Sequence, residues 1–177
     1  PTAEFAWLRS LSEPVGVSID SNLEGVTEEG YLPCQAQGIN FAKKRRATYL
    51  NWSTGVGKSV AMLGLIEWYV DQGLIDLVLC FVKTNNKVNT QRGIDRLWNI
   101  ETDPRSVIVD GTPTKREKQY IEVARAMISG DVPIIITNHE KMRDDCEAMK
   151  MLLEDRRVLI LWDEMSSKLG NENTVYK

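Results

Sequence analysis

The sequence is poor in cysteine and histidine and contains no long apolar run. Its three cysteines, Cys34, Cys80 and Cys146, lie far apart and form no C-x-x-C pair. This spacing argues against a disulfide framework or a zinc site and indicates a reducing compartment. The longest apolar run, near Leu77–Val82, is far shorter than the ~20 residues of a membrane-spanning helix. We therefore expect an intracellular protein, cytoplasmic or nuclear or a viral protein in a host cell, that does not contact a membrane.

An excess of positive charge is also absent. The formal net charge is −3 over 177 residues, so no global positive field indicates nucleic-acid binding. Residues 1–30 hold six acidic side chains and one arginine, with scattered proline and glycine and no sustained hydrophobic period. We predict an irregular lead-in over residues 1–30 and one globular domain over residues 31–177. Because the chain begins at Pro1 rather than methionine, we expect it to be part of a longer protein.

What the sequence does contain is an alternation of short apolar segments with longer amphipathic ones. We predict strands over Ala47–Trp52, Asp76–Val82, Ser106–Asp110, Pro133–Asn138 and Val158–Trp162. We predict helices over Pro33–Arg46, Lys58–Gln72, Asn86–Leu97, Thr114–Ser129 and Asp144–Glu154, with left-handed stops at Gly73 and Gly130. Because near-continuously apolar strands alternate with helices, the pattern indicates an α/β fold, with a parallel sheet flanked by helices on both faces.

A glycine-rich turn lies between the first predicted strand and the helix that follows it. It reads Ser53-Thr54-Gly55-Val56-Gly57-Lys58-Ser59, and the strict phosphate-loop pattern G-x-x-x-x-G-K-[ST] would place glycine where Trp52 stands. Gly55 and Gly57 allow backbone N–H groups to approach and cradle phosphate oxygens. Lys58 can reach the β- and γ-phosphates of ATP, and the Ser59 hydroxyl can bind Mg²⁺. We predict a nucleotide site formed by residues 54–59.

Two acids follow the last predicted strand directly. Asp163 and Glu164 come after Val158–Trp162, at the carboxyl end, where α/β sheets bind their ligands. We expect Asp163 to hold the water shell of Mg²⁺ and Glu164 to polarise the water that attacks the γ-phosphate. Together with Lys58 these acids form the predicted catalytic set, and the cofactors would be ATP and Mg²⁺.

These motifs resemble the first RecA-like lobe of superfamily-two helicases, most closely the Swi/Snf-type translocases that act on double-stranded DNA. The resemblance covers about Tyr31 to Asn171, and the helicase form of the phosphate loop dispenses with the first glycine. Leu32–Phe41 is similar to the adenine-side segment of this family, which implies that Gln35 reads the base. Asp163-Glu164-Met165-Ser166 stands where the family has Asp-Glu-Ala-His, so the histidine that links hydrolysis to the second lobe is missing.

The resemblance also implies contacts with the DNA backbone. Val78–Thr84 is similar to the family's motif Ia, with Lys83 and Thr84 in the basic and hydroxyl positions. Ile134–Glu140 resembles a second contact segment, which includes Thr137. The chain ends before a second RecA-like lobe with its arginine fingers, which raise the rate of ATP hydrolysis about 10³–10⁵-fold. The resemblance thus implies double-stranded DNA and the second lobe as partners, and weak or no activity for this fragment alone.

The sequence therefore predicts the ATP-binding lobe of a DNA-dependent ATPase, a helicase or translocase that couples Mg-ATP hydrolysis to movement along nucleic acid. Two alternatives stay open. The first is the motor subunit of a restriction complex or of a viral DNA-packaging complex. The second is a nucleotide-binding adaptor that does not hydrolyse ATP, and the intact Lys58, Ser59, Asp163 and Glu164 argue against it.

Overall fold

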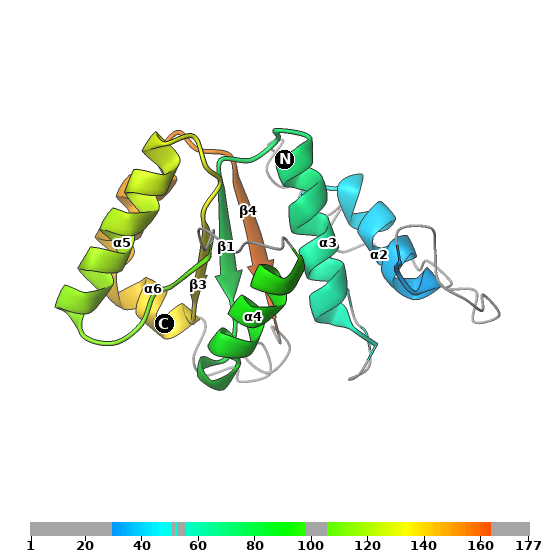
Figure 1. The fold of residues 1–177 in the computed structure, drawn as a ribbon, viewed down its shortest axis with the longest axis horizontal. Helices are drawn as coiled ribbons and strands as arrows, with labels where there is room; N and C mark the ends of the chain where they lie inside the picture. The colour runs from blue at the N-terminus through cyan, green and yellow to red at the C-terminus, as the bar shows by residue number, and fades with distance from the viewer. Residues whose placement is uncertain (1–29, 51, 53–55, 98–105, 164–177) are drawn as a thin grey trace, which may run out of the picture. The chain divides into compact units, whose positions relative to one another are not determined.

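The computed structural model describes residues 30–50, 52, 56–97 and 106–163 (Figure 1). The chain divides into two compact units, residues 1–65 and residues 66–177. Helix α3, Lys58–Asp71, begins in the first unit and ends in the second. The predicted lead-in over residues 1–30 lies outside the described ranges except for Gly30, so its irregular structure stays a prediction.

The first unit contains helix α2, Pro33–Lys43, and the start of α3. Proline at the first position of α2 fits the helix start, because the N–H that proline lacks would have no intrahelical partner there. The helix ends three residues before the predicted Arg46. There Arg45 turns back, and its Nη1 donates to the Phe41 carbonyl at 3.1 Å while its guanidinium lies 3.5 Å from the centre of the Phe41 ring.

The predicted strand over Ala47–Trp52 is wrong for the residues that the structure describes. Residues 47–50 and Trp52 adopt no strand conformation. The Tyr49 side chain is 59% exposed, and Thr48 and Asn51 interrupt the apolar run. A segment of this composition lacks the two covered apolar faces that stabilise an inner parallel strand.

The second unit is built on a parallel sheet of four strands, which confirms four of the five predicted strands and their parallel direction. The strands are β1 Leu77–Phe81, β2 Ser106–Ile108, β3 Ile134–Thr137 and β4 Val158–Trp162, in the order β2-β3-β1-β4. Val78 pairs with Ile134 on one side and with Leu159 on the other, so β1 is an inner strand. All five residues of β1 and all four of β3 are buried, as expected for inner parallel strands.

Helices connect these strands. They are the 3₁₀ turn η1 Thr84–Asn86, α4 Lys87–Leu97, α5 Pro113–Ile128, α6 His139–Asp144 and α7 Cys146–Leu153. The predicted helices match α3, α4, α5 and α7 within about two residues, whereas α6 was not predicted as a helix. Gly73 and Gly130 have φ of 60° and 89°, which confirms the predicted left-handed stops.

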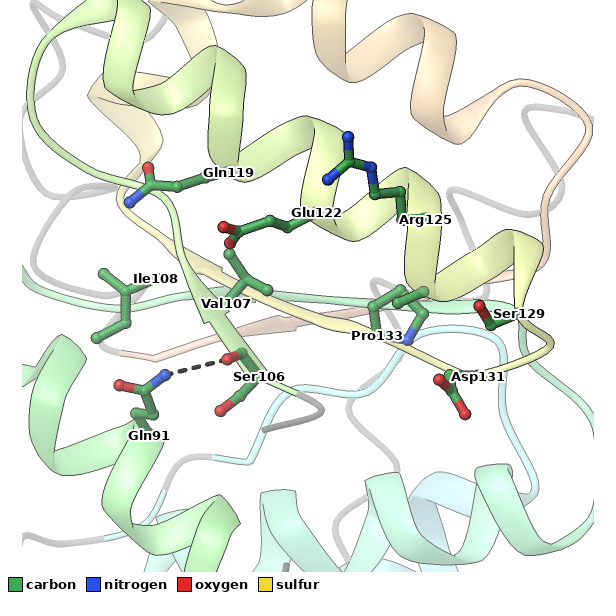
Figure 2. A pocket seen from close by; sticks show the side chains of 11 residues that line it. Gln91, Ser106, Val107, Ile108, Gln119, Glu122, Arg125, Ser129, Asp131 and Pro133 are labelled. Carbon is green, nitrogen blue, oxygen red and sulfur yellow. Dashed lines mark hydrogen bonds between the residues drawn. The ribbon is translucent and has the colours of Figure 1, made fainter. Parts of the chain in front are cut away.

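The main apolar core lies between the sheet and helices α5 and α7. Leu77, Leu79 and Ile135 from the sheet pack with Val123 of α5 and Met149 of α7. Helix α4 contacts β2 and β3, and Figure 2 shows its Gln91 on the opposite side of β2 from Glu122 of α5. The sheet of this unit therefore has helices on both faces, as predicted.

Strand β4 departs from the prediction that both of its faces are covered. Its Ile160 and Trp162 side chains are 55% and 41% exposed, although the strand is entirely apolar. The exposed pair alternates with the buried Leu161, because successive side chains of a strand point to opposite faces. One face of β4 is therefore much less covered than the same face of β1.

Candidate functional site

The predicted phosphate turn leads into helix α3 through a left-handed glycine. Gly57 has φ of +83°, a conformation that side chains other than glycine rarely adopt. Its carbonyl accepts from the backbone N–H of Val60 at 3.0 Å and of Ala61 at 3.2 Å, so the helix begins on this residue. The N–H groups of Lys58 and Ser59 come before the first intrahelical donors and therefore point out of the helix. This end of the 14-residue helix is suited to an anion.

Gln35 of α2 lies against this turn. Its Nε2 donates to the Val56 carbonyl at 3.0 Å, and its Oε1 accepts from the backbone N–H of Leu32 at 3.0 Å. A Cβ atom added at Gly57 would collide with Gln35 Nε2, so the contact requires glycine as well as the positive φ. The structure thus brings the predicted base-reading amide next to the predicted phosphate turn, two segments that are 21 residues apart.

The Lys58 ammonium is held by the chain itself. Its Nζ donates to the Trp52 carbonyl at 2.8 Å, across the mouth of the turn. The side chain of Ser59 is exposed at the first turn of α3. Thr54 and Gly55 lie outside the described residues, so their predicted contacts with phosphate stay predictions.

Asp163 lies in the second unit, directly after β4. Its backbone N–H donates to the Phe81 carbonyl at 2.9 Å, which extends the pairing of β4 with β1 by one residue. The parallel sheet places Asp163 at the same edge as Lys83 and Asn138, because all four strands end there. Glu164 lies outside the described residues. Within the described ranges, no three acid, cysteine or histidine side chains gather as a ready-made metal site.

The residues predicted to contact DNA differ in accessibility. Lys83 and Thr84 follow β1 and are exposed. The Thr84 hydroxyl accepts from Asn138 Nδ2 at 2.9 Å, a bond that ties the ends of β1 and β3 together. Thr137 is fully buried, and its hydroxyl donates to the Val109 carbonyl at 3.2 Å. In this structure Thr137 supports the sheet, and Lys83 and Thr84 are the predicted contacts that face outward.

The sequence did not predict that a lysine at this edge is buried. The Lys87 side chain is 2% exposed, and its Nζ lies 3.1 Å from Oδ2 of Asp110. Burial raises the pKa of Asp110, but the Gly111 N–H and the Lys87 ammonium outweigh it and hold that pKa below its usual value. Asp110 therefore stays charged and neutralises Lys87. No local pattern marks this pair, because it joins the start of α4 to the end of β2.

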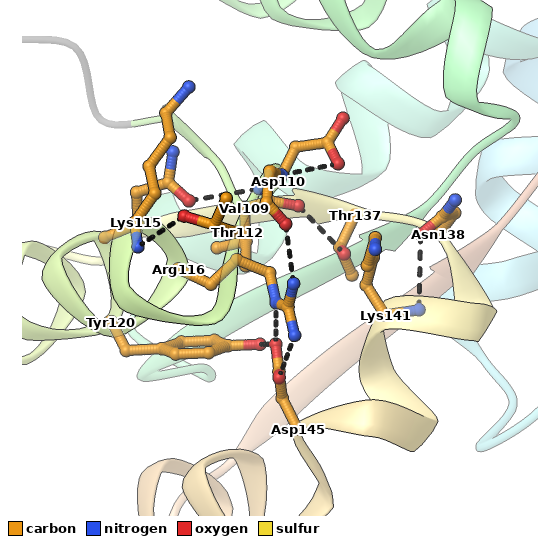
Figure 3. Close-up of polar contacts among 12 residues, drawn as sticks. Val109, Asp110, Thr112, Lys115, Arg116, Tyr120, Thr137, Asn138, Lys141 and Asp145 are labelled. Carbon is orange, nitrogen blue, oxygen red and sulfur yellow. Dashed lines mark hydrogen bonds and ion pairs between the residues drawn. The ribbon is translucent and has the colours of Figure 1, made fainter.

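A second buried ion pair joins α5 to the start of α7 (Figure 3). Arg116 donates to both carboxylate oxygens of Asp145, from Nε at 2.5 Å and from Nη2 at 2.6 Å. Its Nη1 donates to the Gly111 carbonyl at 2.6 Å, and the Tyr120 hydroxyl donates to Asp145 at 2.9 Å. The bonds from Arg116 hold the pKa of Asp145 below its usual value. This cluster is structural, because every polar atom of the carboxylate faces a partner from the same unit.

A groove of about 600 Å³ runs beside the edge strand β2 (Figure 2). Two glutamines bond the backbone along this edge: Gln91 Nε2 donates to the Ser106 carbonyl of β2 at 3.0 Å, and the N–H of Asp110, two residues after β2, donates to Gln119 Oε1 at 3.0 Å. Such side-chain amides occupy the backbone groups that would otherwise pair with another strand. None of the predicted site residues lines this groove.

The chain was compared with protein families and with curated proteins. No family model matches the chain, and no curated protein matches it. In the described ranges, none of the helices has the length and apolarity needed to cross a bilayer.

Proposed function

We propose that this chain is the ATP-binding lobe of a DNA-dependent ATPase of the helicase or translocase type. In this proposal residues 31–177 form the RecA-like lobe, and a second lobe of the complete protein closes over the nucleotide. The observation that carries the proposal is the start of α3. There Gly57 in a left-handed conformation, the ammonium of Lys58 and the amide of Gln35 converge on one short turn.

Each group at this turn has a role that its chemistry supports. The outward N–H groups at the start of α3 bind phosphate oxygens, and Lys58 leaves the Trp52 carbonyl to neutralise the β- and γ-phosphates. Gln35, whose amide bonds Leu32 and Val56 in this structure, would turn its donor and acceptor to the edge of adenine. Ser59 and Asp163 would hold the Mg²⁺ ion, which when bound draws charge from the phosphates. Glu164 would accept the proton of the attacking water.

The nucleic-acid part of the proposal rests on the carboxyl edge of the sheet. Lys83 and Thr84 are exposed there, next to the strand end that leads to Asp163. A cation and a hydroxyl at this edge suit phosphate oxygens of the DNA backbone, and such contacts carry no base sequence information. Movement along DNA would then show little sequence preference and a strong dependence on salt.

The alternatives predict different results in one experiment. Phosphate release by the complete protein is measured with Mg-ATP, with and without double-stranded DNA, for the wild type, Glu164→Gln and the control Glu154→Gln. Glu154 is an exposed acid at the end of α7. We expect DNA to stimulate release, Glu164→Gln to abolish it while Mg-ATP still binds, and Glu154→Gln to change nothing.

The outcomes separate the candidate functions. A complete protein that binds Mg-ATP and releases no phosphate with any DNA would favour the non-hydrolysing adaptor. Turnover that Glu164→Gln leaves unchanged would remove that residue from its role. Phosphate release that requires another subunit of a restriction-modification complex, or a viral capsid protein, in addition to DNA would favour a restriction motor or a packaging motor.

A further inference from the structure

Trp52 lies where the strict phosphate-loop pattern has glycine, and its indole packs against the backbone of α2. A Cβ atom added at Gly38 of α2 would collide with the indole Cζ2 and lie 2.5 Å from Cη2. It would also lie 3.6 Å from Leu50 Cδ1, an ordinary contact. Gly38 is buried in the middle of the helix, where glycine is less favourable than alanine. The close approach of the ring explains why a glycine is needed there.

Helix α2 is attached to the phosphate turn at two places. Gln35 bonds Val56 near the end of the turn. The Trp52 ring, at the beginning of the turn, packs against Gly38. These two positions are three residues apart and therefore lie on one face of the helix. One face of α2 thus contacts the chain on both sides of the turn, at Trp52 and at Val56.

The backbone of Trp52 also determines where the Lys58 ammonium rests. The Trp52 carbonyl accepts from Lys58 Nζ at 2.8 Å, so the position of this residue sets the starting position of the cation. A ring seated on Gly38 holds that carbonyl in place. Displacing the ring would move the carbonyl, and the lysine would lose its position at the mouth of the turn.

We propose that Trp52 is a positioning residue of the nucleotide site: its indole, seated on Gly38, holds the entrance of the phosphate turn and keeps Lys58 ready for the phosphates. This inference rests on the proposed function, because it assumes that the turn binds nucleotide. It goes beyond that function by assigning a role to the side chain that replaces the usual first glycine. Trp52 touches no phosphate in this role and acts through Lys58.

The first variant changes Gly38, the residue that the Trp52 ring packs against, and leaves the ring itself unchanged. Gly38→Ala adds one methyl group under the indole, and Gly64→Ala is the matched control. A Cβ atom at Gly64 would lie 2.5 Å from the Tyr31 hydroxyl and 3.0 Å from Ile39 Cδ1, so it crowds the same unit without touching Trp52. Trp52→Leu removes the ring and leaves Gly38 intact, which keeps the test decisive if Gly38→Ala does not fold.

Two readouts are needed. The ¹⁹F NMR signal of 5-fluorotryptophan at Trp52, assigned by its loss in Trp52→Leu, reports the environment of the ring at Gly38 in the absence of nucleotide. Equilibrium titration with Mg-ATP reports the function. We expect Gly38→Ala to shift the Trp52 signal and to raise the Kd for Mg-ATP about tenfold, Trp52→Leu to raise it similarly, and Gly64→Ala to do neither. In a Trp52→Leu background, Gly38→Ala should add little to the loss of affinity.

The possible failures are distinguishable. A wild-type chain that does not bind Mg-ATP would overturn the proposed function and this inference with it. A wild type that binds Mg-ATP, with unchanged affinity in Gly38→Ala or Trp52→Leu, would overturn the inference alone. A Trp52 signal that Gly38→Ala leaves unmoved would also overturn it, because the ring would not then be seated on Gly38.

Discussion

Replacing Asp145 by asparagine should strongly destabilise the second unit, because the buried Arg116 guanidinium would lose its counter-charge. The two side chains are 6% and 12% exposed and are joined by bonds of 2.5 and 2.6 Å. Removing one partner of a buried ion pair costs about 3–5 kcal/mol. Arg116 keeps its bond to the Gly111 carbonyl, and asparagine keeps one oxygen for the Tyr120 hydroxyl. We therefore expect a loss near the lower end, about 3 kcal/mol.

The neighbouring residue provides the control. Asp144 is 45% exposed, and its Oδ1 lies 3.7 Å from Nη2 of Arg143, which is 82% exposed. Exposed pairs of this kind contribute less than about 1 kcal/mol, so Asp144→Asn should change the free energy of unfolding little. Urea unfolding followed by circular dichroism measures both variants. Equal losses of unfolding free energy for Asp144→Asn and Asp145→Asn would refute the reasoning, since they would show that the buried Arg116–Asp145 pair stabilises the fold no more than an exposed pair does.

The same variant makes a prediction about pH. Bonds from Arg116 lower the pKa of Asp145 in the folded chain below the value of about 3.9 that an unfolded aspartate has. The unfolded chain therefore binds the proton first as pH falls, and the stabilisation is complete above about pH 5 and is lost as pH falls through the folded pKa. The difference between the wild type and Asp145→Asn should shrink on acidification below that range. A difference that stays constant would contradict the assignment.

Three further predictions test other parts of the structure. Cys80 is fully buried, and burial raises its pKa to about 12, so a thiol reagent should modify the exposed Cys146 in the native chain and leave Cys80 unmodified until it unfolds; equal rates would contradict the burial. Gly57→Ala should destabilise the chain more than Gly73→Ala, because both have positive φ but only a Cβ atom at Gly57 collides with a side chain; urea unfolding should show a difference of about 1 kcal/mol or more, and equal losses would count against the Gln35 contact. If Lys83 contacts a phosphate, Lys83→Ala should lower the slope of log affinity against log salt for double-stranded DNA by about one, whereas Lys118→Ala, at an exposed position of α5, should not; a slope for Lys83→Ala equal to that of the wild type would show that Lys83 contacts no phosphate.

The strands that the sequence predicted correctly are those whose signal is local and unbroken. β1 is a run of apolar residues, β3 is apolar up to its last residue, Thr137, and both strands are completely buried. The wrong strand, Ala47–Trp52, contains Thr48 and Asn51, and an exposed Tyr49. Continuity of the apolar run was therefore a better guide than β propensity alone.

The short helix α6 shows what the sequence reasoning overlooked. Asn138 has an extended backbone, and its side chain accepts from the Lys141 N–H, so it caps a helix that starts immediately after β3. Asparagine ahead of His139 and Glu140 is a helix-start signal that could have been noticed. The apolar run before it drew the predicted strand one residue too far.

The candidate site, too, combines features that have a local sequence signal with contacts that have none. The start of α3 at Lys58 follows from a few neighbouring residues, and the sequence predicted it. The sequence also predicted that Gly57 must lack a side chain, but not that its φ is positive. The bond between Gln35 and Val56 spans 21 residues, and the Arg116 pair spans 29. Contacts at such separations depend on how the elements pack, and a single sequence carries no local signal for them.

The most direct test of the nucleotide site is equilibrium titration of this chain with Mg-ATP for the wild type, Lys58→Ala and Lys44→Ala. Lys44 is an exposed lysine of the same unit, at the end of α2, and controls for a general loss of positive charge. A hydrogen bond to a charged group contributes about 1.5–3 kcal/mol, which corresponds to a loss of affinity of about tenfold to a hundredfold. We predict that loss for Lys58→Ala and no change for Lys44→Ala. Mg-ATP binding of equal strength by the wild type and Lys58→Ala would contradict the assignment of the turn as a phosphate site.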